Sequence, residues 1–158
     1  MTPHPLPPPG PGAPTPPIAL GGDPGDVRAR FEARHVEVPD AVVERLRSIC
    51  ATVTDDAAVL AEASRDWWPL AMQWAAEGQV AGLAAAVVTP TGAEEVAAVL
   101  AVCDEARVPV TAAAGRSGVC GASVPLYGGV VLDMTGLTGI RDVDATSLVL
   151  DVRAGTFG

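Results

Sequence analysis

The sequence is poor in aromatic side chains, which are 4% of its 158 residues although 49% of the residues are hydrophobic. Its core must therefore consist mainly of alanine, valine and leucine, which suits helices packed on a buried sheet. Basic residues are also few, ten against 19 acidic ones, and the formal net charge is −9. Because non-specific nucleic-acid binding needs clustered Lys and Arg, we expect no nucleic-acid partner. An acidic chain can still bind a dinucleotide through backbone N–H groups, which favours a small-molecule ligand.

Cysteine and histidine are scarce as well. Cys50, Cys103 and Cys120 form no Cys-x-x-Cys pair, which argues against a disulfide framework and a zinc site. With only His4 and His35, we expect no Ser-His-Asp triad and no histidine-rich metal centre. No apolar run approaches the roughly 20 residues of a membrane-spanning helix, and no secretory signal pattern is present. We therefore expect a cytoplasmic protein without a metal or a membrane span.

Proline marks off the N-terminal region. Residues 1–24 hold ten of the fifteen prolines and almost no large apolar side chains. Such a segment cannot bury enough surface to offset its ordering entropy, so we expect a disordered Pro-rich tail. A Pro-x-x-Pro docking ligand is the alternative interpretation.

Residues 25–83 are predicted to form a helical segment. Asp40 would cap a helix that extends to Cys50, and Thr54 would cap a second helix that extends toward Asp66. Three tryptophans follow, and they are interpreted either as packing anchors or as contacts to a cofactor or substrate. They are Trp67, Trp68 and Trp74.

Residues 84–158 alternate between strand and helix patterns. The continuous apolar run 84–88 predicts a strand buried on both faces. Thr91 and Glu94 form a capping box, which should open a helix that ends before Pro109. The stripe that this helix should bury consists of Val96, Val99, Leu100, Cys103 and Ala106. Further strands are predicted at 108–111 and 129–133, and a β-hairpin at 140–143 and 147–152.

The connection between the second and third predicted strands is built almost entirely of small residues, since residues 112–123 read AAAGRSGVCGAS. A diphosphate needs several converging backbone N–H donors. Small side chains allow this approach, and glycine allows the positive φ angles that turn successive N–H groups inward. The predicted cofactor-binding residues are Ala112, Ala113, Ala114, Gly115, Arg116, Ser117, Gly118, Val119, Gly121 and Ala122. Ser117 would add a hydroxyl donor, while Arg116 would either pair with phosphate or point to solvent.

The segment after this loop distinguishes it from two common nucleotide-binding motifs. A Rossmann Gly-x-Gly-x-x-Gly opens a helix, and a Walker loop ends in Gly-Lys-Ser or Gly-Lys-Thr. This loop has no lysine and runs into VPLYGG at 124–129, which cannot start a helix of useful length. The loop therefore joins two strands, which disfavours an ordinary NAD-binding or P-loop enzyme.

Four motifs follow one another in the second half of the chain: AVVTPTGAEEV (86–96), VPVTAAAGRSGVCGA (108–122), GGVVLDMTGLTGI (128–140) and LVLDVRAGTFG (148–158). In their order and spacing, residues 86–158 resemble the first half of a PCMH-type FAD-binding domain, the domain of the vanillyl-alcohol oxidase and glycolate oxidase superfamily. The alkylglycerone-phosphate synthase-like branch and the glycolate or D-lactate dehydrogenase-like branch are the most similar. The chain departs from the family's Pro and Gly positions at Ala112, Ala114, Arg116 and Ala122.

The resemblance implies an α+β fold in which residues 84–158 are the truncated first half of the FAD-binding domain. The cofactor would be non-covalent FAD. The parent enzyme would oxidise a hydroxy acid or alcohol, or act as an alkylglycerone-phosphate synthase, and would form a homodimer at full length. Its catalytic residues would lie beyond Gly158, so this fragment alone would be inactive. The alternative is a degenerate, non-catalytic scaffold that no longer binds FAD.

Two further side chains have alternative interpretations. Cys120 either reacts with the flavin or fills the underside of the loop, and the second is favoured. Asp133 is either an acid–base group or an acceptor of hydrogen bonds from nearby loop backbone, and the second is again favoured.

Overall fold

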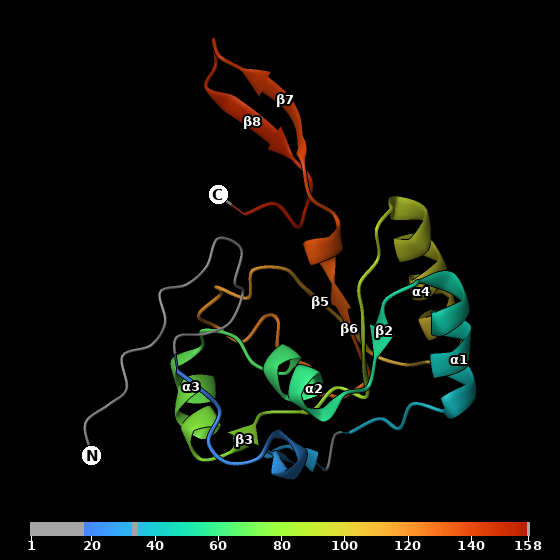
Figure 1. Ribbon diagram of the computed structural model, residues 1–158, viewed down its shortest axis with the longest axis vertical. Helices are drawn as coiled ribbons and strands as arrows, with labels where there is room; N and C mark the ends of the chain where they lie inside the picture. Colours follow the sequence, from blue (N-terminus) through green and yellow to red (C-terminus); the bar gives the residue numbers. More distant parts are fainter. Residues whose placement is uncertain (1–17, 33–34, 158) are drawn as a thin grey trace.

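A four-stranded sheet forms the centre of the computed structural model, which describes residues 18–32 and 35–157 (Figure 1). The strand order is β2-β4-β6-β5. Strands β4 (Ala86–Val88), β6 (Val130–Asp133) and β5 (Val110–Ala113) are parallel, and β2 (Val53–Thr54) pairs antiparallel with β4. Every residue of β4 is buried, which confirms the strand predicted from the apolar run. The combination of helices and sheets confirms the α+β class.

Helices cover both faces of this sheet (Figure 1). Helices α1 (Asp40–Ile49) and α4 (Ala93–Glu105) pack on one face, where Leu46 and Val99 have no exposed surface. Helix α2 (Ala57–Ala63) packs on the other face. Alternate strand residues face the two layers: Val88 and Val130 contact the first, and Val131 the second, as the two-residue period of a strand requires.

Helix α4 differs in detail from its prediction. The backbone N–H and hydroxyl of Thr91 lie 2.7 and 3.3 Å from Glu95 Oε2, so Glu95 takes the role predicted for Glu94. Leu100 is 44% exposed, and Val102 is buried instead. The predicted stripe was therefore wrong at Leu100, because the position of the sheet decides which edge of a helix is covered.

The starts of α1 and α2 also differ from prediction. Asp40 is the first residue of α1, and its predecessor Pro39 caps the helix without a side-chain hydrogen bond. The cap of α2 is Asp56, whose carboxylate accepts the N–H groups of Ala58 and Val59 at 3.0 and 3.1 Å. The predicted cap, Thr54, lies in β2 and accepts the N–H of Asp56.

Residues 25–83 contain α1, α2 and α3 (Pro69–Ala76), together with the short strands β1 (Arg28–Ala29), β2 and β3 (Gln79–Val80), of which β1 and β3 pair in parallel. Residues 1–17 of the predicted tail, and with them most of the Pro-x-x-Pro alternative, lie outside the described residues. The tail's last residues contact the fold. The N–H of Gly21 donates to the Ala75 carbonyl at 2.7 Å, and a 3₁₀ turn, η1, spans Pro24–Asp26.

Strands β7 (Ile140–Asp144) and β8 (Val149–Val152) form the predicted antiparallel hairpin, which projects from the rest of the molecule (Figure 1). A 3₁₀ turn, η3 (Met134–Gly136), lies between β6 and this hairpin. All residues of both hairpin strands are exposed. Among the described residues, no helix is long and apolar enough to cross a membrane.

Candidate functional site

The predicted cofactor loop begins at the carboxyl end of β5 and returns to the neighbouring parallel strand β6 (orange in Figure 1). Of the predicted binding residues, Ala112 and Ala113 lie in β5, and the other eight lie in the loop. No helix occurs between the two strands. This confirms that the loop joins strand to strand, as neither Rossmann nor Walker loops do.

Two loop residues adopt left-handed backbone conformations. Gly121 has φ +77°, and Arg116 has φ +48°, which is uncommon for a residue with a side chain. The sequence pattern identified Arg116 as a replacement for glycine. In the structure, Arg116 nevertheless adopts the kind of conformation for which glycine is usually used, so the loop path does not depend on having glycine there.

The Arg116 side chain turns inward and is partly buried. Burial lowers the pKa of its guanidinium, while the nearby carboxylates of Asp133 and Glu62 act in the opposite direction. Its Nε–H is buried and has no hydrogen-bond partner. The loop therefore has a cation beneath it, with one donor still unused.

Residues 66–68, between α2 and α3, support the underside of the loop. The N–H of Trp67 donates to the Arg116 carbonyl at 3.2 Å. A Cβ built on Gly121 would lie 3.0 Å from Trp68 Cε3, so the Trp68 ring packs directly against this glycine. Asp66 is fully buried, and its Oδ2 lies 3.9 Å from the corresponding point on Gly118.

Asp66 was missed by the sequence analysis. Its Oδ1 accepts the N–H of Trp68 at 2.9 Å, while its Oδ2 is buried without a partner. A fully buried carboxylate oxygen without a donor is rare in folded proteins and calls for an explanation. The only signal in the sequence was the polar run Ser64-Arg65-Asp66 directly before two tryptophans.

The structure distinguishes the alternatives for the other side chains. Asp133 Oδ1 accepts the N–H of Thr135 at 3.0 Å, which confirms its predicted role as an acceptor for loop backbone. Trp68 packs edge-to-face on Trp74, with ring centroids 5.3 Å apart, in agreement with a packing role. Cys120 is exposed, so the prediction that it fills the underside of the loop was wrong. Trp68 and Asp66 occupy that underside instead.

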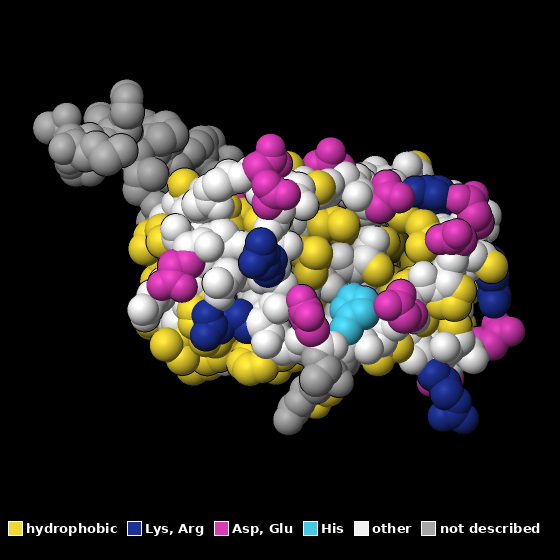
Figure 2. Space-filling model, turned by 90° about the horizontal axis from the view of Figure 1, so that it is seen from below, with side chains coloured by type: hydrophobic (Ala, Val, Ile, Leu, Met, Phe, Trp, Pro, Cys, Tyr) yellow, Lys and Arg dark blue, Asp and Glu magenta, His cyan; other side chains and the backbone are white. Residues whose placement is uncertain are grey.

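The charge distribution and the cavity of the described residues do not by themselves mark the loop as a binding site. The face viewed in Figure 2 shows acidic side chains among separate arginines and no continuous basic patch. A cavity of about 390 Å³ lies between Arg28, Arg30, Glu32 and Gln79 and shares no lining residue with the loop. Among the described residues, no group of three or more side chains could hold a metal ion.

An FAD diphosphate fits the residues of this loop. Small residues leave its backbone accessible, with Ser117, Gly118 and Ala122 exposed. Arg116 Nε, a buried donor without a hydrogen-bond partner, lies at the loop. Loop N–H groups together with one nearby cation suit a doubly charged anion.

Comparisons with known proteins agree with this geometry. A family model described as an FAD binding domain matches residues 84–158. A D-lactate dehydrogenase of Anaerostipes hadrus is 36% identical over 69 residues, which are 44% of this chain and 14% of that protein. The glycolate oxidase subunit GlcD of Bacillus subtilis is 31% identical over 70 residues, which are 44% of this chain and 15% of that protein. This chain thus spans only about one seventh of the length of these curated relatives.

The solved structure of an alkyldihydroxyacetonephosphate synthase superposes with a TM-score of 0.68 over 89% of this chain and 27% of the synthase. At 20% identity this likeness concerns the fold alone, and it includes much of the segment before residue 84. The four ordered motifs, the strand-to-strand loop and the family match agree. Residues 84–158 match the family of FAD binding domains, in agreement with the predicted resemblance to the PCMH-type flavoprotein superfamily.

Proposed function

We propose that this chain is the FAD-binding portion of a flavin-dependent oxidoreductase that acts on a hydroxy acid. The observation that carries the proposal is the small-residue loop between β5 and β6, with an inward-turned cation at Arg116. The substrate class is supported by the relatives, whose names refer to D-lactate, glycolate and, in a protein of rice (Oryza sativa) 30% identical over 84 residues, D-2-hydroxyglutarate. All three are 2-hydroxy acids.

In this proposal the backbone N–H groups of residues 114–122 bind the FAD diphosphate, and Ser117 adds its exposed hydroxyl. Bound flavin would supply the acceptor for the hydride that leaves the hydroxyl-bearing carbon of the substrate. This chain's residues would bind and orient the cofactor, while Asp133 would hold the turn after β6. A cytoplasmic location and a homodimer of the full-length protein remain predictions.

The competing proposal is a scaffold that has lost FAD, based on the replacements at Ala112, Ala114, Arg116 and Ala122. The left-handed conformation of Arg116 favours the binding function, because the replacement that should distort the loop most adopts the kind of backbone conformation for which glycine is usually used. An alkylglycerone-phosphate synthase activity has weaker support, since the likeness to that enzyme is one of fold.

The visible absorption spectrum of the protein, purified as its gene encodes it, tests the proposal. We expect a flavin band that passes into the filtrate after heat denaturation and filtration, as non-covalent FAD would. Oxidation of 2-hydroxy acids would then be screened by bleaching of this band. A protein that shows no band, even after incubation with FAD, would contradict the proposal and favour the scaffold.

Arg116→Gln is expected to weaken FAD binding about tenfold, while Arg116→Lys should retain most of the affinity. The reason is charge: Lys at this position keeps a positive charge beneath the loop, whereas Gln removes the cation that would attract the diphosphate. Titration calorimetry at low and high salt measures the effect, and salt should reduce the difference between the variants. Equal affinities for the Gln and Lys variants would show that the charge is not used.

Cys120 is expected to be the first thiol that iodoacetamide modifies, and FAD should slow the reaction because it covers the loop. Burial raises the pKa of Cys50 to about 11 and also raises the pKa of Cys103, so both carry little reactive thiolate near pH 7. Mass spectrometry of timed samples measures the rates, with urea-unfolded protein as the control in which all three react. An unchanged Cys120 rate at saturating FAD would contradict a ligand on this loop.

A further inference from the structure

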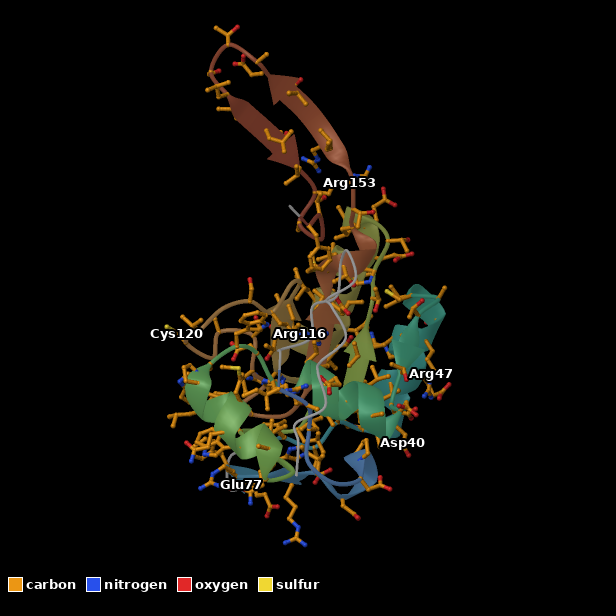
Figure 3. All side chains as sticks on the ribbon, turned by 60° about the vertical axis from the view of Figure 1, so that its left-hand side comes forward. Asp40, Arg47, Glu77, Arg116, Cys120 and Arg153 are labelled. Atoms are coloured by element: carbon orange, nitrogen blue, oxygen red, sulfur yellow. The ribbon has the colours of Figure 1, made fainter. Side chains whose placement is uncertain are left out.

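The loop is supported by a segment that lies outside the region matched by the FAD-binding family model. That region begins at residue 84, whereas the supporting residues are 66–68. Trp67 binds the loop through its backbone, Trp68 through ring packing on Gly121, and Asp66 lies beside Gly118. Figure 3 shows Cys120 at the outer side of the loop, above helix α3, and Arg116 nearer the sheet. The segment therefore contacts the loop from its inner side.

Asp66 is the residue of this segment whose side-chain hydrogen bonding is incomplete. Its carboxylate has no exposed surface, and only one of its oxygens has a donor. Leaving a buried polar oxygen without a hydrogen-bond partner is unfavourable, and folded proteins usually avoid it. The Cβ position of Gly118 lies 3.9 Å from Asp66 Oδ2, so the loop backbone passes beside the unpaired oxygen.

We propose that Asp66 and Trp68 are positioning residues for the cofactor: when the loop closes on the FAD diphosphate, a loop N–H donates to Asp66 Oδ2 while Gly121 rests on the Trp68 ring. This rests on the proposed function, because it assumes that the loop binds FAD. It extends the cofactor site to the segment between α2 and α3. The free protein retains the unpaired oxygen, and the bound protein satisfies it.

This arrangement predicts opposite effects of one substitution on stability and on binding. In Asp66→Asn the amide keeps an oxygen for the Trp68 N–H but replaces the unpaired oxygen with a donor group. Because the replaced oxygen has no hydrogen-bond partner, no hydrogen bond is lost, and the melting temperature of the free protein should stay unchanged or rise. The loss of the acceptor for the loop should weaken binding of FAD, and of ADP, which shares the diphosphate, by about tenfold each.

The test compares wild type, Asp66→Asn and the matched surface control Asp104→Asn, whose side chain is exposed on α4. Calorimetry gives the affinities for FAD and ADP, and thermal unfolding without ligand gives the stability. Trp68→Phe is a second variant, expected to weaken both ligands several-fold. The expected result is weaker binding of both ligands by Asp66→Asn without loss of stability, and no change in Asp104→Asn.

Three outcomes would overturn the inference. If Asp66→Asn binds both ligands as wild type does, the positioning role is wrong while the proposed function stands. If its affinity falls only together with its melting temperature, Asp66 is merely structural. If wild type binds neither FAD nor ADP, the proposed function fails and the positioning role fails with it.

Discussion

Gly121→Val is expected to weaken FAD binding about 100-fold. Gly121 has φ +77°, a conformation that β-branched residues almost never adopt, and a Cβ there would lie 3.0 Å from the Trp68 ring. The valine must therefore move the loop away from its present path against the Trp68 ring. Calorimetric titration of the purified variant with FAD measures the loss.

Gly22→Val is the matched control for this substitution. Gly22 has nearly the same backbone angle, φ +80°, but no atom lies within 4 Å of a Cβ built there, and it is not part of the loop. The control variant should be less stable than wild type because of the backbone strain. Its affinity for FAD should be close to that of wild type. Similar affinities in the two variants would mean that FAD does not need the loop conformation seen here.

Gly129→Ala is expected to lower the free energy of unfolding by about 2–5 kcal/mol. Gly129 precedes β6, the strand between β4 and β5, and has φ +73°. A Cβ there would lie 2.2 Å from the carbonyl oxygen of Pro109, which is backbone and cannot turn aside. Since small domains are stable by only about 5–15 kcal/mol, this change could unfold a large fraction of the protein.

Urea denaturation of the free protein, with linear extrapolation to water, measures this loss. Gly22→Ala is again the control, because it has a similar φ and open space around the added methyl group. We expect it to cost about 1–2 kcal/mol, the strain of a left-handed backbone alone. Equal losses in the two variants would show that β5 and β6 adjust to the added methyl group, and that this contact does not limit the fold.

The resemblance to PCMH-type domains was confirmed because its motifs are local and keep their order along the chain. Each is a strand, a capped helix or a loop whose pattern depends on neighbouring residues. The capping box was predicted one residue away from its observed position, at Glu94 instead of Glu95, and the buried stripe was wrong at Leu100, where Val102 is buried instead. Spacing specifies that a helix starts and has an apolar side, whereas the residue that accepts the cap hydrogen bonds and the edge of the helix that is covered depend on what packs beside it.

The sequence by itself determined the strand–helix–strand order of residues 84–133, the absence of a helix after the loop, and the hairpin that follows. Tertiary structure alone decided that Asp66 and Trp68 lie under a loop about 50 residues further along, that Cys120 faces outward, and that Arg116 turns in toward Asp133. The physical reason is the distance along the chain over which each kind of interaction acts. Periodicity and capping act over one or two helical turns, while contacts between distant segments arise only when the sheet and its helices pack together.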